Sequence, residues 1–390
     1  MSALLIHYHE LALKGKNRRY FEDRLLREIQ KFLGPFKDSK IKKIAGRMIV
    51  ETEGTDLLAL QKIISRLPGI ANSQIVDVYP ADLKTLCDII PPQVPAGKGT
   101  FAIRGRRDAK HYPFTSADMG REIGSAVNVA TGRPVDLSHP TLEICVEIAS
   151  NKAYVGIGPK VNGFRGLPSG VSGKALTLLS GGFDSPVAFH LMQCRGLEVH
   201  GIHFHSAPMV SRASIDKVKE LCEVLSLSQS KLKLALVPIV DFQKQVVAHC
   251  PDPLRILLYR RFMLRLAGMW AQRLKAKVLI NGDSLGQVAS QTIENITAIS
   301  DIARRPIFRP LIGMSKEMIL DIAKKIGTED ISKLPHDDCC GFLMPQKPAI
   351  KATIGQLEEA EAKLDIPELC QQTFSDKEIF TYECGKLKKE

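Results

Sequence analysis

The sequence predicts an α/β protein in which two small α+β modules precede a doubly wound domain with a parallel sheet. Strand-like segments outnumber helical ones up to residue 165. Residues 159–174 then concentrate Gly, Pro and Ser, which is typical of a linker. From residue 175 onward, strands alternate with helices long enough to cross over between parallel strands. We therefore expect domains at 1–59, 60–165 and 175–350, a linker at 166–174 and a C-terminal helix and tail at 351–390.

The first module is predicted from the period of its apolar residues. Phe21, Leu25, Ile29 and Leu33 recur every four positions, which indicates an amphipathic helix beginning at Asn17. Short apolar runs flank this helix on both sides. The expected elements are a strand at 3–8, the helix at 17–33, two short strands around Gly46 and a helix at 56–66.

The second module repeats the mixture of strands and helices. Its longest helix is bounded by a plausible cap at Ser116 and a stop at Gly132. The expected elements are a strand near 74–80, a helix at 81–90, a strand at 100–107, the helix at 116–132, and paired strands at 142–149 and 152–158.

In the third domain, strands alternate with helices, which predicts a parallel sheet. Its strands are expected at 175–179, 198–204, 232–238 and 277–281. Its helices are expected at 186–195, 211–225, within 240–273, at 285–302 and at 315–326. Ligands in open sheets of this kind bind beyond the carboxyl ends of the strands, so functional residues are expected there.

The net charge of +12 is concentrated at the front of the chain. Residues 1–170 hold 25 Lys and Arg against 17 Asp and Glu, whereas the remaining residues hold 29 against 25. A basic front half favours a polyanionic partner, because neutralising phosphates releases counterions. A solvated basic surface without a partner explains the same counts.

The cysteines and the lengths of the apolar runs indicate the cellular compartment of the protein. The nine cysteines include no C-x-x-C pair, so a zinc ribbon is poorly supported and free thiols are expected. The sequence has neither a signal-peptide pattern nor an apolar run of membrane-spanning length. We expect a cytoplasmic protein without a membrane partner.

The stretch SGGFDS at 180–185, between a buried strand and a helix, has the pattern of a phosphate cradle. Gly181 and Gly182 can take positive φ and place no Cβ in the way. Ser180 and Ser185 add hydroxyl donors, and Pro186 suits the first helical turn. Asp184 would repel a phosphate unless a cation lies between them, which predicts Mg²⁺ bridging a triphosphate and this carboxylate.

Two other patterns near this loop have alternative interpretations. SGVSGKA resembles a Walker A loop, but position 168 is Pro and Ala175 follows Lys174, so we reject it. His200, His203 and His205 are spaced as a metal cluster could be, although roles in a nucleotide pocket or the core fit better. A tight glycine turn without a ligand remains an alternative for the SGGFDS loop itself.

The SGGFDS loop resembles that of the PP-loop ATP pyrophosphatases, which cleave ATP between its α- and β-phosphates and adenylate an oxygen. Further stretches are similar to the tRNA 4-thiouridine synthetases, the tRNA sulfurtransferase family called ThiI. They are HYHELALKGKNRRYFE, RGLPSGVSGK, GIHFHSAP, YRRFM, NGDSLGQVASQT, RPLIGMSKEMI and HDDCCGF, in this order. The resemblance implies a ferredoxin-like domain, a THUMP domain and a PP-loop catalytic domain.

The resemblance also implies roles for individual residues. The residues implied to bind ATP are Leu178, Leu179, Ser180, Gly181, Gly182, Asp184, Ser185, His203, Phe204, Arg260, Gly282 and Gln291. Arg261, beside Arg260, is a rival for the phosphate-binding role. Lys316 is implied to stabilise the reacting phosphate or the leaving pyrophosphate, unless it is merely a solvated lysine at a helix start.

Cys340 matches the family's sulfur-bearing cysteine. The neighbouring Asp337 and Asp338 should raise its thiol pKa, so a persulfide rather than a free thiolate is the expected nucleophile. Cys339 is a weak candidate for a resolving thiol. Cys370 and Cys384 in the tail are further candidates.

Longer family members end in a rhodanese-like domain with another cysteine, and this sequence has none. We expect a separate sulfur carrier, or a cysteine desulfurase acting on Cys340 directly, as the persulfide donor. The missing domain also makes a role in thiamine synthesis doubtful.

The family implies that the THUMP domain holds the acceptor end of tRNA and that the protein is a homodimer. Basic clusters in the front half are the expected contacts: Lys14, Lys16, Arg18, Arg19, Arg104, Arg106, Arg107 and Lys110. Tyr112 and Phe114 are candidates for base stacking. We therefore expect an enzyme that uses ATP and Mg²⁺ to form 4-thiouridine in tRNA. Another PP-loop ligase, such as one forming 2-thiouridine or an amide, and a non-catalytic tRNA-binding protein remain alternatives.

Overall fold

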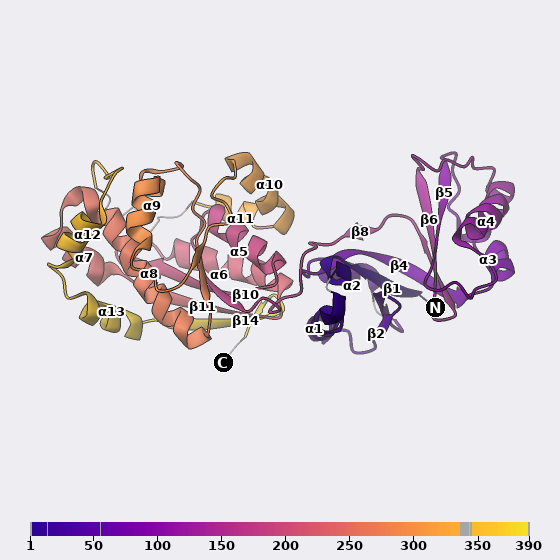
Figure 1. Ribbon diagram of the computed structural model, residues 1–390, viewed down its shortest axis with the longest axis horizontal. Coiled ribbons are helices and arrows are strands. Elements are labelled where there is room, and N and C mark those ends of the chain that lie inside the picture. The colour runs from indigo at the N-terminus through magenta and orange to yellow at the C-terminus, as the bar shows by residue number, and fades with distance from the viewer. Residues whose placement is uncertain (1, 14, 55, 336–342, 344, 389–390) are drawn as a thin grey trace. The chain divides into compact units, whose positions relative to one another are not determined.

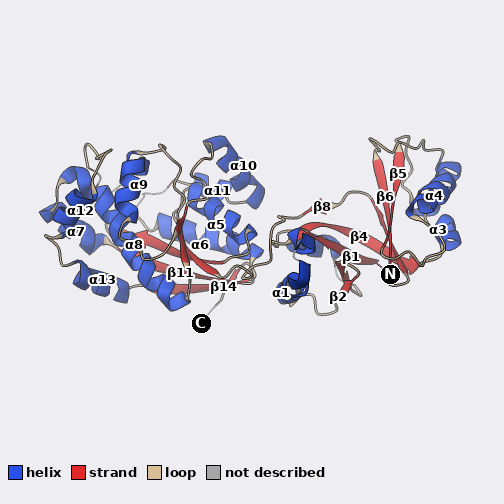
Figure 2. Cartoon of the chain, in the orientation of Figure 1, coloured by secondary structure: helices blue, strands red, loops and turns tan. Residues whose placement is uncertain are grey.

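The computed structural model describes residues 2–13, 15–54, 56–335, 343 and 345–388. The chain divides into two compact units, Met1–Leu167 and Pro168–Glu390. Each unit has its own sheet, covered by helices (Figures 1 and 2). The predicted combination of a mixed α+β front half and a parallel-sheet back half is confirmed.

The first unit is built on one sheet in the order β2-β3-β1-β4-β7-β6-β5, with β8 paired to β4. Its strands are β1 (Ser2–Tyr8), β2 (Lys40–Ile44), β3 (Arg47–Glu51), β4 (Ile70–Pro80), β5 (Phe101–Arg107), β6 (Leu142–Ala149), β7 (Lys152–Ile157) and β8 (Val161–Asn162). Its α-helices are α1 (Arg18–Phe32), α2 (Leu57–Ile64), α3 (Leu83–Ile89) and α4 (Ser116–Thr131).

The long strand β4 joins the two predicted modules of this unit. It pairs with β1 over Ile70–Asp77 and with β7 over Asp77–Pro80. The backbone hydrogen bonds therefore continue from the first module into the second through a single strand (Figure 2). Helices α3 and α4 bury their apolar faces against β5, β6 and β7, in a core that includes Phe101, Ile123 and Val146.

A buried ion pair links strands that are far apart in this sheet. Arg47 on β3 donates to Glu147 on β6, and His7 on β1 lies 2.9 Å from the same carboxylate. Both charged partners are almost fully buried. Burial alone would raise the pKa of Glu147, but His7 and Arg47 outweigh it and hold that pKa below its usual value. Removing either charge would leave the other desolvated, so the pair fixes this packing.

The second unit has a sheet in the order β13-β12-β9-β10-β11-β14-β15. The first five strands in this order are parallel to one another. At one edge, β14 pairs antiparallel with β11, and β15 pairs antiparallel with β14. The strands are β9 (Lys174–Leu178), β10 (Glu198–His205), β11 (Lys231–Pro238), β12 (Val278–Ile280), β13 (Ile307–Phe308), β14 (Glu378–Glu383) and β15 (Lys386–Leu387). The order of the parallel strands turns at β9, which is where an open sheet of this kind binds its ligand.

Helices cover both faces of this sheet, as expected for strands buried on two sides. The α-helices are α5 (Asp184–Cys194), α6 (Ala213–Leu225), α7 (Val240–His249), α8 (Arg255–Leu274), α9 (Ile293–Ser300), α10 (Lys316–Ile326), α11 (Glu329–Lys333), α12 (Ile354–Glu361) and α13 (Ile366–Ser375). The largest core lies between the sheet and α8, where Leu176, Ile202 and Val237 meet Leu258 and Phe262.

Several predicted boundaries were wrong. Helix α4 is capped by the Thr115 side chain, because Thr115 has the extended backbone that a cap needs. Helix α5 begins at Asp184, so Pro186 is its third residue rather than its first. The helix expected at 285–302 is shortened to α9, and the residues before it form a loop at the carboxyl edge of the sheet. No helix among the described residues is both long and apolar enough to cross a bilayer.

The C-terminal segment is an integral part of the second unit. Strand β14 extends the sheet by pairing antiparallel with β11, and Tyr382 on it is fully buried. Arg261 on α8, which is 1% exposed, binds both carboxylate oxygens of Glu361 on α12 at 3.0 Å. Arg265 binds the same two oxygens at 2.6 and 2.8 Å. Helix α12, the charged helix predicted for this segment, is therefore held against α8 by a buried cluster of ion pairs.

Replacing Glu361 with Gln is expected to lower the unfolding free energy at pH 7 by about 3 kcal/mol, because two desolvated guanidinium groups lose their counter-charge. Burial would raise the pKa of Glu361, but Arg265 and Arg261 outweigh it and hold that pKa below the ordinary 4.5. The stabilisation is therefore complete above the unfolded pKa and is lost as pH falls through the folded one. The difference in unfolding free energy between the wild-type protein and Glu361→Gln, measured with urea, should therefore be smaller at about pH 3.5 than at pH 7.

The exposed Glu358→Gln on the same helix is the matched control and should change stability little at either pH. An equal loss of stability at both pH values in Glu361→Gln would contradict this account.

Candidate active site

The predicted phosphate loop lies between the end of β9 at Leu178 and the start of α5 at Asp184. The amide of Ser180 donates to the Ser185 hydroxyl at 2.8 Å, and the two serine hydroxyls are 3.1 Å apart. These contacts close the turn around the first residues of α5. The positive end of the α5 dipole is thereby placed at the carboxyl edge of the sheet, which favours an anion there.

The two glycines of this loop do not have the backbone that we expected. Neither Gly181 nor Gly182 has a positive φ. A Cβ at Gly182 would meet only the Ser180 hydroxyl, at an ordinary 3.7 Å. The loop is closed by serine hydroxyls rather than by left-handed residues. What Gly182 contributes is a backbone free of a side chain on the partly exposed face of the turn.

Gly282 permits a close approach of protein backbone. A Cβ there would lie 2.8 Å from the amide nitrogen of Ser185 and 2.9 Å from the carbonyl carbon of Asp184. The end of β12 and the first turn of α5 are thus packed backbone to backbone. Gly282 therefore sets the position of the phosphate loop relative to the neighbouring strand.

Gly282→Ala is expected to displace the first turn of α5, costing about 1–3 kcal/mol of unfolding free energy and raising the KM for ATP. Gly313→Ala is the matched control, because a Cβ there meets nothing within 4 Å. Thermal unfolding and ATP-dependent activity of the two variants provide the comparison. A Gly282→Ala protein with wild-type KM and stability would show that the backbone contact is not needed.

Asp184 and Lys316 come together across 132 residues of sequence. The Lys316 Nζ at the start of α10 donates to one Asp184 carboxylate oxygen at 3.1 Å. The Gln287 side chain donates to the other oxygen at 3.3 Å. Lys316 also lies over the ring of Phe183, 5.1 Å from its centroid. The acid and the cation predicted for catalysis therefore share one partly exposed position at the phosphate loop.

Asp283, which our sequence analysis missed, organises the neighbouring part of the site. It follows β12 and is 2% exposed. One carboxylate oxygen accepts from Arg260 at 2.5 Å and from Gln291 at 3.4 Å. The other accepts from Arg309 at 3.0 Å. Its position directly after a predicted strand at the carboxyl edge was the signal that could have identified it.

The structure distinguishes Arg260 from its rival Arg261. Arg260 points toward the loop of Gln291, where it also donates to the Ser290 carbonyl at 3.0 Å. Arg261 is buried on the other side of α8 and is committed to Glu361 and to the Ala298 carbonyl. Each nitrogen of the Arg261 guanidinium is bound to a protein oxygen and the residue is 1% exposed, which favours a structural role over phosphate binding.

The residues expected beside adenine lie where the two central strands end. His203 on β10 is 2.9 Å from the Leu179 carbonyl, through its Nδ1 atom. The side chains of Leu179 and Phe204 are buried, and Phe204 belongs to the core against α8. Leu178 is only partly buried. Both strands end at the carboxyl edge of the sheet, beside the start of the phosphate loop.

A metal centre made by the histidines is not supported. His200 is 3.2 Å from Glu198, and His203 is turned to the Leu179 carbonyl. His205 is buried, and burial lowers its pKa. Within the described residues, no group of three or more His, Cys, Asp or Glu side chains is placed to hold a metal ion.

The predicted sulfur-bearing Cys340 lies outside the described residues, as do Asp337, Asp338 and Cys339. The chain leading to them is described up to residue 335, and it passes the phosphate loop. The Ser332 hydroxyl on α11 donates to the Gly182 carbonyl at 3.4 Å. Of the tail cysteines, Cys370 is buried, which raises its pKa to about 11 and disfavours a reactive thiolate there.

The basic residues expected to hold tRNA fall into two groups in the first unit. Four carry structural contacts to varying degrees. Arg18 binds Tyr8 and Glu22, Arg104 binds Glu143, Arg107 donates to the carbonyl of Phe114 at 2.8 Å, and Arg19 lies 4.0 Å from Asp23. Lys16, Arg106 and Lys110 are exposed and form no ion pair with described residues. Lys14 lies outside the described residues.

The expected stacking platform is wrong. Tyr112 and Phe114 are buried in the core beneath α4, with ring centroids 6.1 Å apart. The Tyr112 hydroxyl accepts from the backbone amide of Asn151. Their rings are therefore unavailable to a base, because both side chains are packed in the core of the second module.

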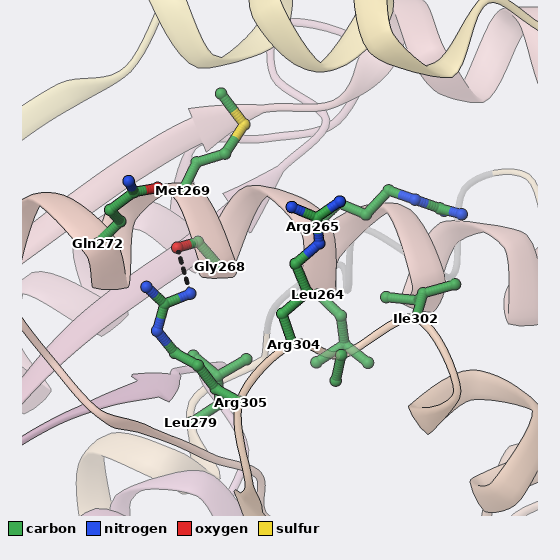
Figure 3. Close-up of a pocket in the computed structure, with 10 residues that line it drawn as sticks. Leu264, Arg265, Gly268, Met269, Gln272, Leu279, Ile302, Arg304 and Arg305 are labelled. Atoms are coloured by element: carbon green, nitrogen blue, oxygen red, sulfur yellow. Dashed lines mark hydrogen bonds between the residues drawn. The ribbon is translucent and has the colours of Figure 1, made fainter.

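A cavity of about 420 Å³ beside α8 contains none of the predicted site residues (Figure 3). Its arginines are largely engaged in internal contacts. Arg265 binds Glu361, and Arg305 donates to the carbonyls of Gly268 and Ala276. The predicted site residues, unlike this cavity, meet at the carboxyl ends of the parallel strands.

A serine- and glycine-containing turn, an acid and a lysine at the carboxyl edge of a doubly wound sheet define a nucleotide-binding α/β enzyme of the phosphate-loop class. Within that class, the chain belongs to the ThiI family of tRNA sulfurtransferases. The model of the family described as "Thiamine biosynthesis protein (ThiI)" matches residues 170–366. A ThiI ferredoxin-like domain matches residues 3–73, and a THUMP domain matches residues 82–158.

Individual relatives agree with this membership. A protein of Moorella thermoacetica named "Probable tRNA sulfurtransferase" is 37% identical over 384 residues, covering 98% of each chain. A protein of the same name from Thermoanaerobacter sp. is 40% identical, covering 93% of this chain and 95% of its own. The crystal structure of a 4-thiouridine synthetase–RNA complex with bound ATP matches with a TM-score of 0.88 and 30% identity, covering 98% of this chain and 100% of that one.

Proposed function

We propose that this protein is an ATP-dependent tRNA sulfurtransferase that converts a uridine of tRNA to 4-thiouridine. The observation that carries the proposal is the meeting of Asp184 and Lys316 at the phosphate loop. The solved relative of the same fold was crystallised with both ATP and RNA, which supports a nucleotide at this loop. The three domains and their order are those of the family.

The reaction begins with adenylation of the uridine. The oxygen on carbon 4 attacks the α-phosphorus of ATP, the bond to the bridging oxygen breaks, and pyrophosphate leaves. The N-terminus of α5 and the loop amides face the phosphates, and Lys316 neutralises charge that develops on the leaving group. Arg260, held by Asp283, supplies a second fixed cation near the same edge. The proposed ATP site is completed by Leu178, Leu179, Ser180, Gly181, Gly182, Ser185, His203, Phe204, Gly282 and Gln291.

The site fits Mg²⁺ carried in with ATP. Asp184 offers a partly exposed carboxylate whose oxygens accept, among the described residues, from the side chains of Lys316 and Gln287. Carboxylate oxygen together with phosphate oxygen is the ligand set that Mg²⁺ prefers. When bound, the ion would shield the phosphate charge from Asp184. Lys316, freed from the carboxylate, can then turn to the phosphates.

Sulfur transfer completes the proposed reaction. The terminal sulfur of a persulfide on Cys340 attacks carbon 4, the C4–O bond breaks, and AMP leaves. Release of the thiocarbonyl then breaks the S–S bond, with a second thiol supplying the electrons and becoming disulfide-bonded. Leu334 is six residues before Cys340, and a fully extended chain of that length spans at most about 20 Å. Because Ser332 contacts Gly182, the length of the intervening chain is compatible with the proposed role of Cys340 at the loop.

Residues 349 and 350, which follow Cys340 in the chain, also contact residues near the site. The Ile350 carbonyl accepts from Thr292, and the Ala349 carbonyl accepts from Asn295, at 2.8 Å each. Thr292 directly follows Gln291, and Asn295 lies in the first turn of α9. Described residues on both sides of Cys340 in the chain thus contact the phosphate loop and the residues that follow Gln291, which supports the proposed role of Cys340.

The tRNA is proposed to lie along the first unit, with its acceptor end on the THUMP domain. Lys16, Arg106 and Lys110 are the best candidates for phosphate contacts, because their charges are exposed and uncommitted among the described residues. Arg18, Arg104 and Arg107 are proposed to shape the same surface from their structural positions, and Arg19 and Lys14 to extend it.

Other parts of the assignment are proposals of the same kind. We propose a homodimer, a cytoplasmic setting in keeping with the free thiols of the described cysteines, and a cysteine desulfurase or separate sulfur carrier as donor. The boundaries at residues 59, 165, 174 and 350 also remain our proposal for the domains.

Incubation of the protein with ATP, Mg²⁺, transcribed tRNA and sodium sulfide tests the function. The expected products are pyrophosphate, AMP and a tRNA whose digest contains 4-thiouridine by mass spectrometry. A digest containing 2-thiouridine would favour a different ligase of the same fold. Pyrophosphate release that stays at background with tRNA present would favour a binding protein without catalysis.

A further inference from the structure

Lys217 on α6 is a buried lysine whose ammonium is directed at the end of a different helix. The residue is only 3% exposed. Its Nζ donates to the carbonyl of Ser332 at 2.9 Å and to that of Leu334 at 2.6 Å. These are among the last carbonyls of α11, which a helix of five residues cannot satisfy internally. A cation is also favoured there by the helix dipole.

These two hydrogen bonds fix the direction in which the chain leaves α11. Leu334 is 50% exposed, so packing covers only part of this residue. Its backbone turns to an extended conformation, with ψ of 138°, which suits a residue before Pro335. The position of this exit therefore depends on the Lys217 ammonium more than on any apolar contact of Leu334.

The same exit is coupled to the phosphate loop. Ser332 presents its carbonyl to Lys217 and its hydroxyl to the Gly182 carbonyl, at 3.4 Å. One residue thus connects a buried ammonium on α6 with the loop that is proposed to hold ATP. Burial lowers the pKa of Lys217, in keeping with a desolvated position. Burying such a group is costly unless its hydrogen bonds are well made.

We propose that Lys217 is a positioning residue for sulfur transfer. It holds the end of α11 against the phosphate loop, so that sulfur carried on the chain beyond residue 335 meets an activated uridine at that loop. This inference rests on the proposed function. It concerns the second half of the reaction, because Lys217 touches neither the loop amides nor the Asp184–Lys316 pair.

The test separates sulfur delivered by the protein from sulfur delivered by solution. Lys217→Met, Lys217→Arg and Ser332→Ala are compared with wild type in the presence of ATP, Mg²⁺ and transcribed tRNA. In one arm, cysteine, a purified cysteine desulfurase and dithiothreitol supply protein-borne sulfur. In the other, millimolar sodium sulfide attacks the adenylated base directly. Pyrophosphate and 4-thiouridine are measured in both arms.

In the desulfurase arm, Lys217→Met is expected to form about tenfold less 4-thiouridine per pyrophosphate, because a misplacement of about 1 Å is enough to slow such a step severely. The sulfide arm should keep the wild-type ratio, since free sulfide does not depend on the α11 exit. Lys217→Arg, which can still donate to both carbonyls, should recover part of the loss. Ser332→Ala should show a smaller loss of the same kind. Lys324→Met, an exposed lysine on α10, is the control and should change neither arm.

A parallel loss of pyrophosphate and 4-thiouridine in both arms would show an ordinary structural role and overturn the proposal. An unchanged ratio in the desulfurase arm would also overturn it. If Lys217→Met does not fold, as judged by thermal unfolding, Lys217→Arg and Ser332→Ala decide the question by the same ratio. A wild-type protein that releases no pyrophosphate with tRNA would count against the proposed function itself.

Discussion

Replacing Asp184 with Asn is expected to lower the rate of 4-thiouridine formation about a hundredfold or more, while leaving the fold intact. The substitution keeps the size of the side chain but removes its charge. The carboxylate is partly exposed and lies at the first residue of α5, with Lys316 and Gln287 as its partners. None of these contacts is part of the apolar core, so stability should change little.

The loss should fall mainly on kcat. Without the carboxylate, the Mg²⁺ that we propose to enter with ATP would have one fewer oxygen ligand. Raising the Mg²⁺ concentration should therefore recover part of the activity of Asp184→Asn. The exposed Asp321→Asn on α10 is the matched control and should behave as wild type. Asp184→Asn with full activity at every Mg²⁺ concentration would contradict the assignment.

Replacing Asp283 with Ala is expected to have the second largest effect, and of a different kind. The carboxylate is 3% exposed and binds Arg260 and Arg309, which are themselves largely buried. Removing it leaves two desolvated guanidinium groups without a counter-charge, which should cost about 3–5 kcal/mol of unfolding free energy. Because Arg260 and Gln291 also lose their common acceptor, the KM for ATP should rise about tenfold or more.

Urea unfolding and ATP-dependent pyrophosphate release provide the two measurements for this variant. Asp283→Asn, which retains an acceptor oxygen, should be intermediate in both. Asp301→Ala, an exposed acid after α9, is the control for removal of a negative charge from the same region. An Asp283→Ala protein whose stability falls while its KM for ATP stays at the wild-type value would mean that Asp283 supports the fold but not the ATP site.

The two variants separate chemistry from organisation. Asp184 is expected to act at the reacting phosphates, so its loss should leave ATP binding and stability largely unchanged. Asp283 is expected to act through Arg260 and Gln291, so its loss should weaken binding and stability together. Measuring kcat, KM and unfolding for both proteins therefore tests the division of roles that the hydrogen bonds suggest.

The sequence was informative where a role depends on neighbours in the chain. The strand–SGGFDS–helix pattern predicted the phosphate loop, because a turn between a strand and a helix N-terminus is a local structure. The four-residue period of α1 and the alternation of strands and helices after residue 175 predicted elements that the structure contains. The order of the motifs predicted the family, which the comparisons support over nearly the whole chain.

The sequence misled where burial decides the role of a side chain. Tyr112 and Phe114 beside a basic cluster predicted base stacking, yet both pack beneath α4. The two glycines of the loop predicted positive φ, whereas hydroxyl contacts of Ser180 and Ser185 close the turn. Arg260 and Arg261 were indistinguishable by pattern, although adjacent residues on a helix point in directions about 100° apart.

The sequence by itself determined the local framework of this protein: the loop that can cradle phosphates, the helices and strands on either side of it, and the family to which they belong. Only the tertiary structure decided the partnerships across long separations, such as Lys316 with Asp184, Asp283 with Arg309, and Lys217 with Ser332. The physical reason is that local structure follows from backbone and side-chain preferences within a few residues. Which charges are desolvated together depends on how the sheet and its helices pack, and that packing is set by the whole chain.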